Sequence, residues 1–168
     1  MKTTIYLIIA FILNLALVSC ISEEEPDAVS LSVGDKCPDF SVRLNDGKLT
    51  STSDLKGMTS VIVFFNTSCP DCRREFPQIQ KVYDFAVSVN RPITVLCIAR
   101  AESDSSIKSY WELNGLSMPY SAQEDKSVYD LFASSVIPRI YIISPSLEIT
   151  ATWSDNPLPT AEEIINKL

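Results

Sequence analysis

The chain has 168 residues, with 14 basic and 21 acidic side chains, four glycines and no histidine. Its net charge of −7 excludes a basic surface of the kind that binds nucleic-acid phosphates. The sequence also lacks a Gly-rich phosphate loop and an internal repeat, so we expect no nucleic acid and no nucleotide among its partners.

The first twenty residues have the pattern of a targeting segment. Lys2 gives a positive start, and the apolar stretch over residues 5–18 is too short to cross a membrane comfortably. The stretch ends in Leu17-Val18-Ser19-Cys20, which resembles a bacterial lipobox, in which the cysteine is lipidated after cleavage. We therefore expect residues 1–19 to be a lipoprotein signal peptide and Cys20 to anchor the chain to a lipid bilayer. An ordinary secretory signal is the alternative.

Residues 20–30 are polar and acidic around Glu23-Glu24-Glu25, which predicts a flexible tether. Without residues 1–19 the chain would carry 13 basic and 21 acidic residues, a net charge of −8. An acidic cluster after a lipidated cysteine also resembles the export signal of surface lipoproteins in some Gram-negative groups, so surface display is an alternative to a periplasm-facing position. Residues 31–168 remain for one domain, which is long enough to bury a core.

The domain begins with turn signals and then a buried strand. Asn45-Asp46-Gly47-Lys48 predicts a hairpin turn and hence a two-stranded flap. Residues 53–57 predict a capped helical turn closed by glycine. The continuous apolar run that follows, residues 61–66, predicts a central strand buried on both faces.

Cys69-Pro70-Asp71-Cys72 lies where this strand gives way to helix-forming residues. Two thiols at the start of a helix can close into a disulfide and reopen, and the unpaired N–H groups there favour a thiolate at Cys69. Half of a zinc site is the alternative, but it needs two further ligands, and the chain has no histidine and no second Cys-x-x-Cys pair. We expect a redox-active disulfide and neither a metal nor a bound cofactor.

Helix and strand patterns alternate over the rest of the chain. Apolar residues at three- and four-residue spacings after Cys72 predict a buried helix face, bent at Pro77. Residues 92–99 predict a second buried strand, which requires a parallel crossover, and Cys97 within it is expected to be a core residue. Amphipathic helices are expected at residues 105–113 and 127–133, with a loop between them.

Two strand candidates, residues 139–144 and 147–153, and a terminal helix from Thr160 complete the chain. The order of flap, strand-helix-strand, extra helices and strand-strand-helix predicts an α/β fold with a mixed central sheet flanked by helices. Four cysteines allow three pairings, of which Cys69 with Cys72 is the close one in sequence; a pair between Cys37 and Cys97 is left open.

The position of Cys69-Pro70-Asp71-Cys72, the order of elements and an isolated proline before the last two strands resemble the thioredoxin fold. The continuation Arg73-Arg74-Glu75-Phe76-Pro77, the segment over residues 34–40 and the anchor with its tether resemble the membrane-tethered TlpA/ResA-type family. This resemblance implies a thioredoxin fold with an N-terminal β-hairpin and a helical insertion. It also implies a thiol:disulfide oxidoreductase of the bacterial cell envelope, facing outside the cytoplasm.

The resemblance assigns roles to individual residues. Cys69 would attack a substrate disulfide and Cys72 would resolve the mixed disulfide. Glu75 matches the family's active-site glutamate, as a proton acceptor for Cys72 or a partner contact; a solvated glutamate in the first helical turn is the alternative. Pro138 matches the family's cis-proline, and Ile137 would present its backbone to a bound chain.

Ser68, Pro70 and Asp71 flank the two thiols and are expected to contact substrate. Three positions depart from the thioredoxin pattern: Val63 replaces a buried carboxylate, Ser68 stands where relatives have tryptophan, and Asp71 adds a negative charge between the cysteines.

The expected partners are exported proteins with thiols or disulfides, a membrane electron donor, and the lipid bilayer through Cys20. Two other functions remain open. One is a non-catalytic binding module with a structural disulfide. The other is a peroxiredoxin-like thiol peroxidase, although residues 65–69 lack the proline of the peroxidatic pattern.

Overall fold

The computed structural model describes residues 30–168. The signal peptide predicted at residues 1–19, the lipidation site Cys20 and the tether as far as residue 29 lie outside the described residues. Within residues 30–168, no helix has both the length and the apolar character needed to cross a bilayer.

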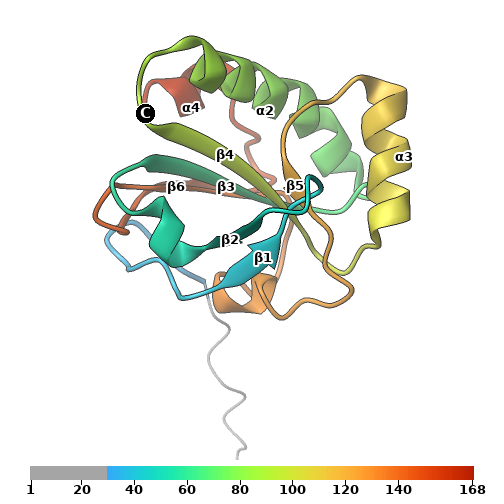
Figure 1. Cartoon of the computed structure of the whole chain (residues 1–168), viewed down its shortest axis with the longest axis horizontal. Coiled ribbons are helices and arrows are strands. Elements are labelled where there is room, and N and C mark those ends of the chain that lie inside the picture. Colours follow the sequence, from blue (N-terminus) through green and yellow to red (C-terminus); the bar gives the residue numbers. More distant parts are fainter. Residues whose placement is uncertain (1–29) are drawn as a thin grey trace, which may run out of the picture.

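A five-stranded mixed sheet, in the order β5-β4-β3-β6-β7, forms the centre of the molecule (Figure 1). Its strands are β3 (Thr59–Phe65), β4 (Ile93–Ala99), β5 (Tyr120–Ser121), β6 (Arg139–Ile143) and β7 (Ile149–Trp153). The central strand β3 pairs in parallel with β4 and antiparallel with β6. This mixed sheet with its helices confirms the predicted α/β fold.

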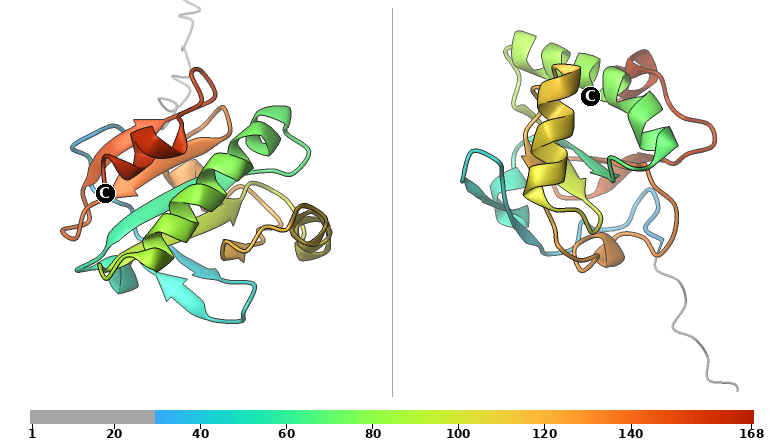
Figure 2. Two further views of the ribbon diagram at one scale, coloured as in Figure 1. Left: turned by 90° about the horizontal axis from the view of Figure 1, so that it is seen from above. Right: turned by 90° about the vertical axis from the view of Figure 1, so that its right-hand side faces the viewer.

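Helices α2 (Pro70–Ser88) and α4 (Ala161–Ile165) cover one face of the sheet, and the hairpin lies on the other (Figure 2). Helix α3 (Asp104–Asn114) packs at the β5 end of the sheet, against the same core cluster as α2. Side chains alternate along β3, so Val63 and Phe65 face α2 while Phe64 faces the opposite cluster. The continuous apolar run of β3 therefore fills both halves of the core.

The N-terminal hairpin consists of β1 (Ser41–Arg43) and β2 (Leu49–Ser51), which pair antiparallel as predicted. Gly47 in its turn has φ +86°, a left-handed conformation that favours glycine. Asn45 contacts the edge strand β5: its N–H donates to the Tyr120 carbonyl at 2.8 Å, and its Oδ1 accepts from the Tyr120 N–H at 3.1 Å.

The segment before the hairpin lies along the opposite edge of the sheet. The N–H of Gly34 donates to the Ile149 carbonyl, and the N–H of Ile149 donates to the Asp35 carbonyl, both at 2.9 Å. The two outer strands are therefore both hydrogen-bonded to residues that precede β3. The predicted helical turn after the hairpin is the 3-10 helix η2 (Thr52–Leu55), in which the Ser51 N–H donates to Asp54.

Two predictions about secondary structure were wrong. The helix expected at residues 127–133 is reduced to the single 3-10 turn η3 (Tyr129–Leu131), and Ala133 at the end of the expected helix instead forms an antiparallel bridge with Ser30. The loop expected between the two insertion helices contains β5, which pairs in parallel with the end of β4. A two-residue strand after Pro119 is too short to produce a pattern in the sequence.

Candidate active site

The two cysteines of Cys69-Pro70-Asp71-Cys72 lie at the N-terminus of α2, directly after β3. Cys69 is the N-cap residue and half-buried, whereas Cys72 is fully buried one turn into the helix. Both are free thiols in this structure. Burial raises the pKa of Cys72 well above its usual range, and a hydrogen bond from the Asn66 backbone partly opposes this. The structure thus contains one accessible thiol and one buried thiol in the same motif.

The loop before β6 faces the accessible thiol. The sulfur of Cys69 lies 3.6 Å from the carbonyl oxygen of Ile137, although 68 positions separate the two residues. The Ile137–Pro138 peptide bond is cis, as the resemblance implied, and Pro138 is buried. The fold therefore brings Cys69, Ile137 and Pro138 together at the end of the sheet where the C-terminal ends of the parallel strands β3 and β4 lie.

The residues that flank the thiols have different degrees of exposure. Pro70 occupies the first turn of α2 and is exposed, while Asp71 is half-buried and forms an ion pair with Arg74. Ser68 is exposed, and its N–H donates to Asn66 Oδ1 at 2.8 Å. All three lie beside the thiols and are accessible to a bound chain.

A carboxylate from the loop after β4 holds the turn that precedes Cys69. Glu102 Oε2 accepts from the Thr67 N–H at 2.7 Å, and its other oxygen accepts from the Thr67 hydroxyl. Nδ2 of Asn66 also donates to the Arg100 carbonyl at 3.2 Å, and Arg73 Nε donates to the Thr67 carbonyl. Sequence reasoning missed this support because Glu102 follows Thr67 by 35 positions and belongs to no local motif.

Glu75 is a buried carboxyl group one turn after Cys72. Its side chain is 2% exposed, and its Oε1 has no hydrogen-bond partner. Burial, with a smaller contribution from Glu163, raises the pKa of Glu75 to about 8. The alternative of a solvated first-turn glutamate was therefore wrong. Val63, where thioredoxins have a carboxylate, is apolar and buried among other core residues, so Glu75 is the buried carboxyl group of the described residues.

The other two described cysteines lie away from this site and from each other. Cys97 belongs to the core on the α2 face, and Cys37 belongs to the core on the hairpin face. Both are free thiols, and burial raises the pKa of Cys37 to about 11 and that of Cys97 to about 12. The sheet separates the two, and Cys97 is a core residue as predicted.

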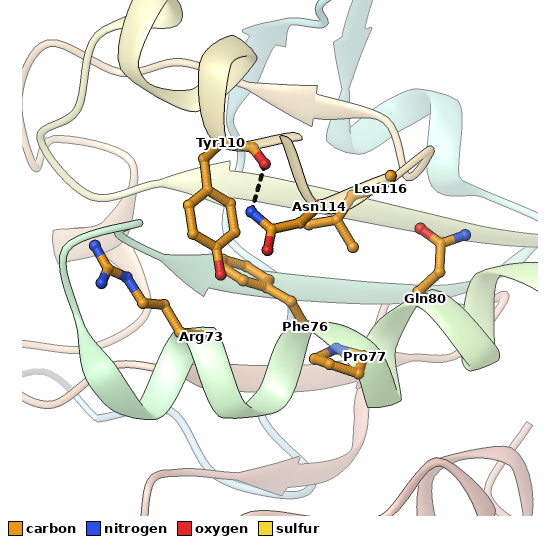
Figure 3. A pocket seen from close by; sticks show the side chains of 8 residues that line it. Arg73, Phe76, Pro77, Gln80, Tyr110, Asn114 and Leu116 are labelled. Atoms are coloured by element: carbon orange, nitrogen blue, oxygen red, sulfur yellow. Dashed lines mark hydrogen bonds between the residues drawn. The ribbon is translucent and has the colours of Figure 1, made fainter. Parts of the chain in front are cut away.

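A cavity of about 280 Å³ opens between α2 and α3, beside the first turn of α2 (Figure 3). The rings of Phe76 and Tyr110 form its apolar wall, with their centroids 5.5 Å apart. The guanidinium of Arg73 lies 5.7 Å from the centroid of the Tyr110 ring, at the end nearest the thiols. Within residues 30–168, no cluster of three metal-ligating side chains is present.

Comparisons with known proteins agree with this geometry. The model of the AhpC/TSA family matches residues 33–152. The thiol-disulfide oxidoreductase ResA of Bacillus subtilis (strain 168) is 28% identical over 116 residues, which are 69% of this chain and 64% of ResA. ResA of Oceanobacillus iheyensis is 25% identical over 152 residues, covering 88% of this chain and 77% of that protein. The chain thus spans slightly less than two thirds of the length of the first of these relatives.

A solved structure has the same architecture. The crystal structure of a thiol:disulfide interchange protein of the thioredoxin family from Chlorobium tepidum TLS superposes with a TM-score of 0.68 at 24% identity. The match covers 82% of this chain and 96% of that one. The fold described above is therefore a thioredoxin fold.

Proposed function

We propose that this chain, which belongs to the AhpC/TSA family and is a TlpA/ResA-type thioredoxin-like protein, exchanges disulfides with other proteins through Cys69 and Cys72. The observation that supports this most directly is the half-buried Cys69 at the start of α2, 3.6 Å from the Ile137 carbonyl and one turn before the buried Cys72. A thiol placed in this way can be reached by a substrate, while its partner is shielded from other reactions.

In the proposed reaction, the Cys69 thiolate attacks one sulfur of a substrate disulfide. The substrate S–S bond breaks, its other sulfur leaves as a thiolate that takes up a proton, and Cys69 is joined to the substrate. Cys72 then loses its proton and attacks the Cys69 sulfur, which releases the second substrate thiol. Two electrons have passed to the substrate, and the protein carries a Cys69–Cys72 disulfide that a membrane electron donor would reduce again.

Glu75 is the proposed proton acceptor for Cys72. Its carboxyl group is buried, and one of its oxygens has no hydrogen-bond partner. With a pKa of about 8, a minority of Glu75 is ionised at neutral pH, and this ionised carboxylate is a stronger base than an ordinary carboxylate, so it takes up the Cys72 proton less unfavourably. With Val63 in place of the thioredoxin carboxylate, Glu75 is the acid-base group that the buried end of the site offers.

The proposed substrates are exported proteins, bound as an extended chain along the backbone of Ile137 and over Ser68, Pro70 and Asp71. We place the protein in the bacterial cell envelope, held at the membrane through a lipid on Cys20 and facing the periplasm. We expect it to act as a reductant, with a potential nearer −270 mV than −120 mV, the approximate values for thioredoxin and DsbA. Equilibration with glutathione or dithiothreitol measures this potential, and a value above about −180 mV would contradict a reducing role.

Trapping tests the proposed function directly. The Cys72→Ala variant should accumulate mixed disulfides between Cys69 and its substrates in envelope extracts, because the resolving thiol is missing. Cys97→Ala, which removes a buried thiol on the sheet, is the matched control and should trap nothing. Recovery of no mixed disulfide from Cys72→Ala would favour the non-catalytic binding module, and consumption of peroxide by the purified protein would favour the peroxidase.

A further inference from the structure

Two arginines flank the end of the central strand β3, on the face opposite α2. Arg139 in β6 is paired with Phe64 of β3. Arg100 directly follows β4, and its N–H donates to the Phe65 carbonyl at 2.7 Å. Because side chains alternate along strands, both arginines project to the face that carries Phe64. Both are half-buried.

The Arg100 guanidinium lies over the ring of Tyr129 in η3. The Arg100 Cζ lies 4.7 Å from the centroid of the Tyr129 ring. Burial raises the pKa of Tyr129, the positive charges of Arg100 and Arg139 oppose that rise, and the negative charge of Asp130 adds to it. The hydroxyl donates to the Val136 carbonyl at 3.0 Å, and Val136 is followed directly by Ile137 and Pro138. The arginine pair is therefore connected to the active-site loop.

Neither arginine forms an ion pair within the described part of the chain, although Asp130 of η3 carries a negative charge that acts on Tyr129. The ion pair present in residues 30–168 joins Arg74 to Asp71, and it involves neither Arg100 nor Arg139. The Nε atoms of both arginines are buried without a hydrogen-bond partner. Half-buried guanidinium groups are costly unless a carboxylate or another anion pairs with them. An anion bound between these two arginines would therefore be stabilising.

The start of the described chain lies beside this site. Arg139 Nη2 donates to the Ser30 hydroxyl at 2.8 Å, and Ser30 bridges to Ala133 after η3. In Figure 1 the blue start of the described chain runs close to the orange η3 segment. The acidic residues upstream of Ser30 are Glu23, Glu24, Glu25 and Asp27. Three to seven residues can span roughly 10–25 Å, so these carboxylates are all within reach of the arginines.

We propose that Arg100 and Arg139 form a carboxylate-binding site and that its occupant is the acidic segment of residues 23–27 of the same chain. The negative segment would neutralise the two positive charges at the place where the chain enters the domain. This inference goes beyond the proposed function and does not depend on it, because it concerns how the acidic segment is bound.

A double-mutant cycle on the purified protein tests the proposal through denaturant unfolding. One variant neutralises the segment with Glu23→Gln, Glu24→Gln, Glu25→Gln and Asp27→Asn. The second combines Arg100→Gln with Arg139→Gln, and a third variant carries both sets. The matched control combines Arg43→Gln with Arg91→Gln, which removes two exposed arginines of β1 and of the segment before β4 and changes the net charge equally.

Neutralising the segment should raise the unfolding equilibrium constant about two- to fivefold in the natural background and in the control background. It should have no effect in the Arg100→Gln/Arg139→Gln background, where the site has lost its charge. The effect should also vanish at about 1 M salt, where the Debye length is about 3 Å. Equal effects in all backgrounds would overturn the proposal. A second result would also overturn it. If replacing the two arginines slowed the reaction with an acidic disulfide peptide more than the reaction with a neutral one, and showed no coupling to residues 23–27, the occupant of the site would be a partner's carboxylate.

Discussion

A buried carboxyl group at Glu75 should make the stability of the molecule depend on pH. Its pKa is raised from 4.5 to about 8 in the folded protein. Between these values the folded state keeps a proton that the unfolded chain has released, so the free energy of unfolding should fall as the pH rises from about 5 to about 8. Glu75→Gln keeps the shape and cannot ionise, so its stability should change much less over this range. Denaturant unfolding at several pH values measures the difference.

The control for this prediction is Glu162→Gln, which removes an exposed carboxylate from α4. It should retain the pH dependence of the natural protein. If Glu75→Gln shows the same slope as the natural protein, Glu75 ionises normally and cannot serve as a proton acceptor with a raised pKa.

The different burial of Cys69 and Cys72 should appear in their rates of alkylation. In the reduced, folded protein at pH 7, iodoacetamide should modify Cys69 at least about tenfold faster than Cys72, because Cys72 is fully buried and its pKa is raised. Peptide mass spectrometry after timed quenching gives both rates. Equal rates, or faster reaction of Cys72, would reverse the proposed roles of attacking and resolving thiol.

Among the elements of the structure, the turn before α2 depends on a contact with the loop after β4. Replacing Glu102 with alanine leaves the buried N–H of Thr67 without its charged acceptor, which should lower the free energy of unfolding by about 1–3 kcal/mol. The loss should also slow disulfide reduction, because Thr67 lies two residues before Cys69. The exposed Glu124→Ala is the control. Denaturant unfolding and an insulin reduction assay measure the two effects, and an unchanged stability would show that the turn holds without Glu102.

The short helix α4 should depend on its N-cap. Thr160 Oγ1 accepts from the Glu163 N–H at 3.2 Å, and Glu163 Oε2 accepts from the Thr160 N–H at 2.7 Å. Thr160→Ala should therefore cost about 0.5–2 kcal/mol in denaturant unfolding. The N-cap of α3, Ser103, makes no such hydrogen bond, so Ser103→Ala should cost clearly less. Equal costs would mean that capping does not limit α4.

Elements with strong local patterns could be predicted from the sequence, and those that depend on distant partners could not. The apolar run of β3 and the apolar stripe of α2 identified both elements. Burial on two faces gives a continuous run of apolar residues, and burial on one face of a helix gives apolar residues at three- and four-residue spacings. The segment around Tyr129 shows where prediction from local sequence fails. It has apolar spacing suited to a helix, but the helical geometry ends after one turn, and Ala133 instead forms a bridge with Ser30. The same limit applies to Glu102 and Glu75, whose hydrogen bonding and burial depend on the tertiary fold.

For the whole molecule, the sheet acts as a barrier between two halves of the core, and this determines which disulfides can form. Cys37 and Cys97 lie in the core clusters on opposite faces. In the oxidised protein we expect a single disulfide among the described cysteines, between Cys69 and Cys72. Alkylation without reduction should leave Cys37 and Cys97 unmodified when the protein is folded, and should add two labels among these four cysteines after denaturation. Mass spectrometry that finds Cys37 linked to Cys97 would contradict the arrangement of the two core clusters.

The residues before β3 also cover part of both edges of the sheet, where another chain could otherwise pair. Asn45 occupies both backbone hydrogen-bonding groups of Tyr120 at one edge, and Gly34 and Asp35 occupy those of Ile149 at the other. Exposed strand edges are templates for intermolecular pairing, and a protein held at a membrane would meet its neighbours at high local concentration. We therefore expect the N-terminal segment to hinder intermolecular pairing at both edges of the sheet. A chain that loses residues 30–51 would be expected to aggregate even where its central strands still form.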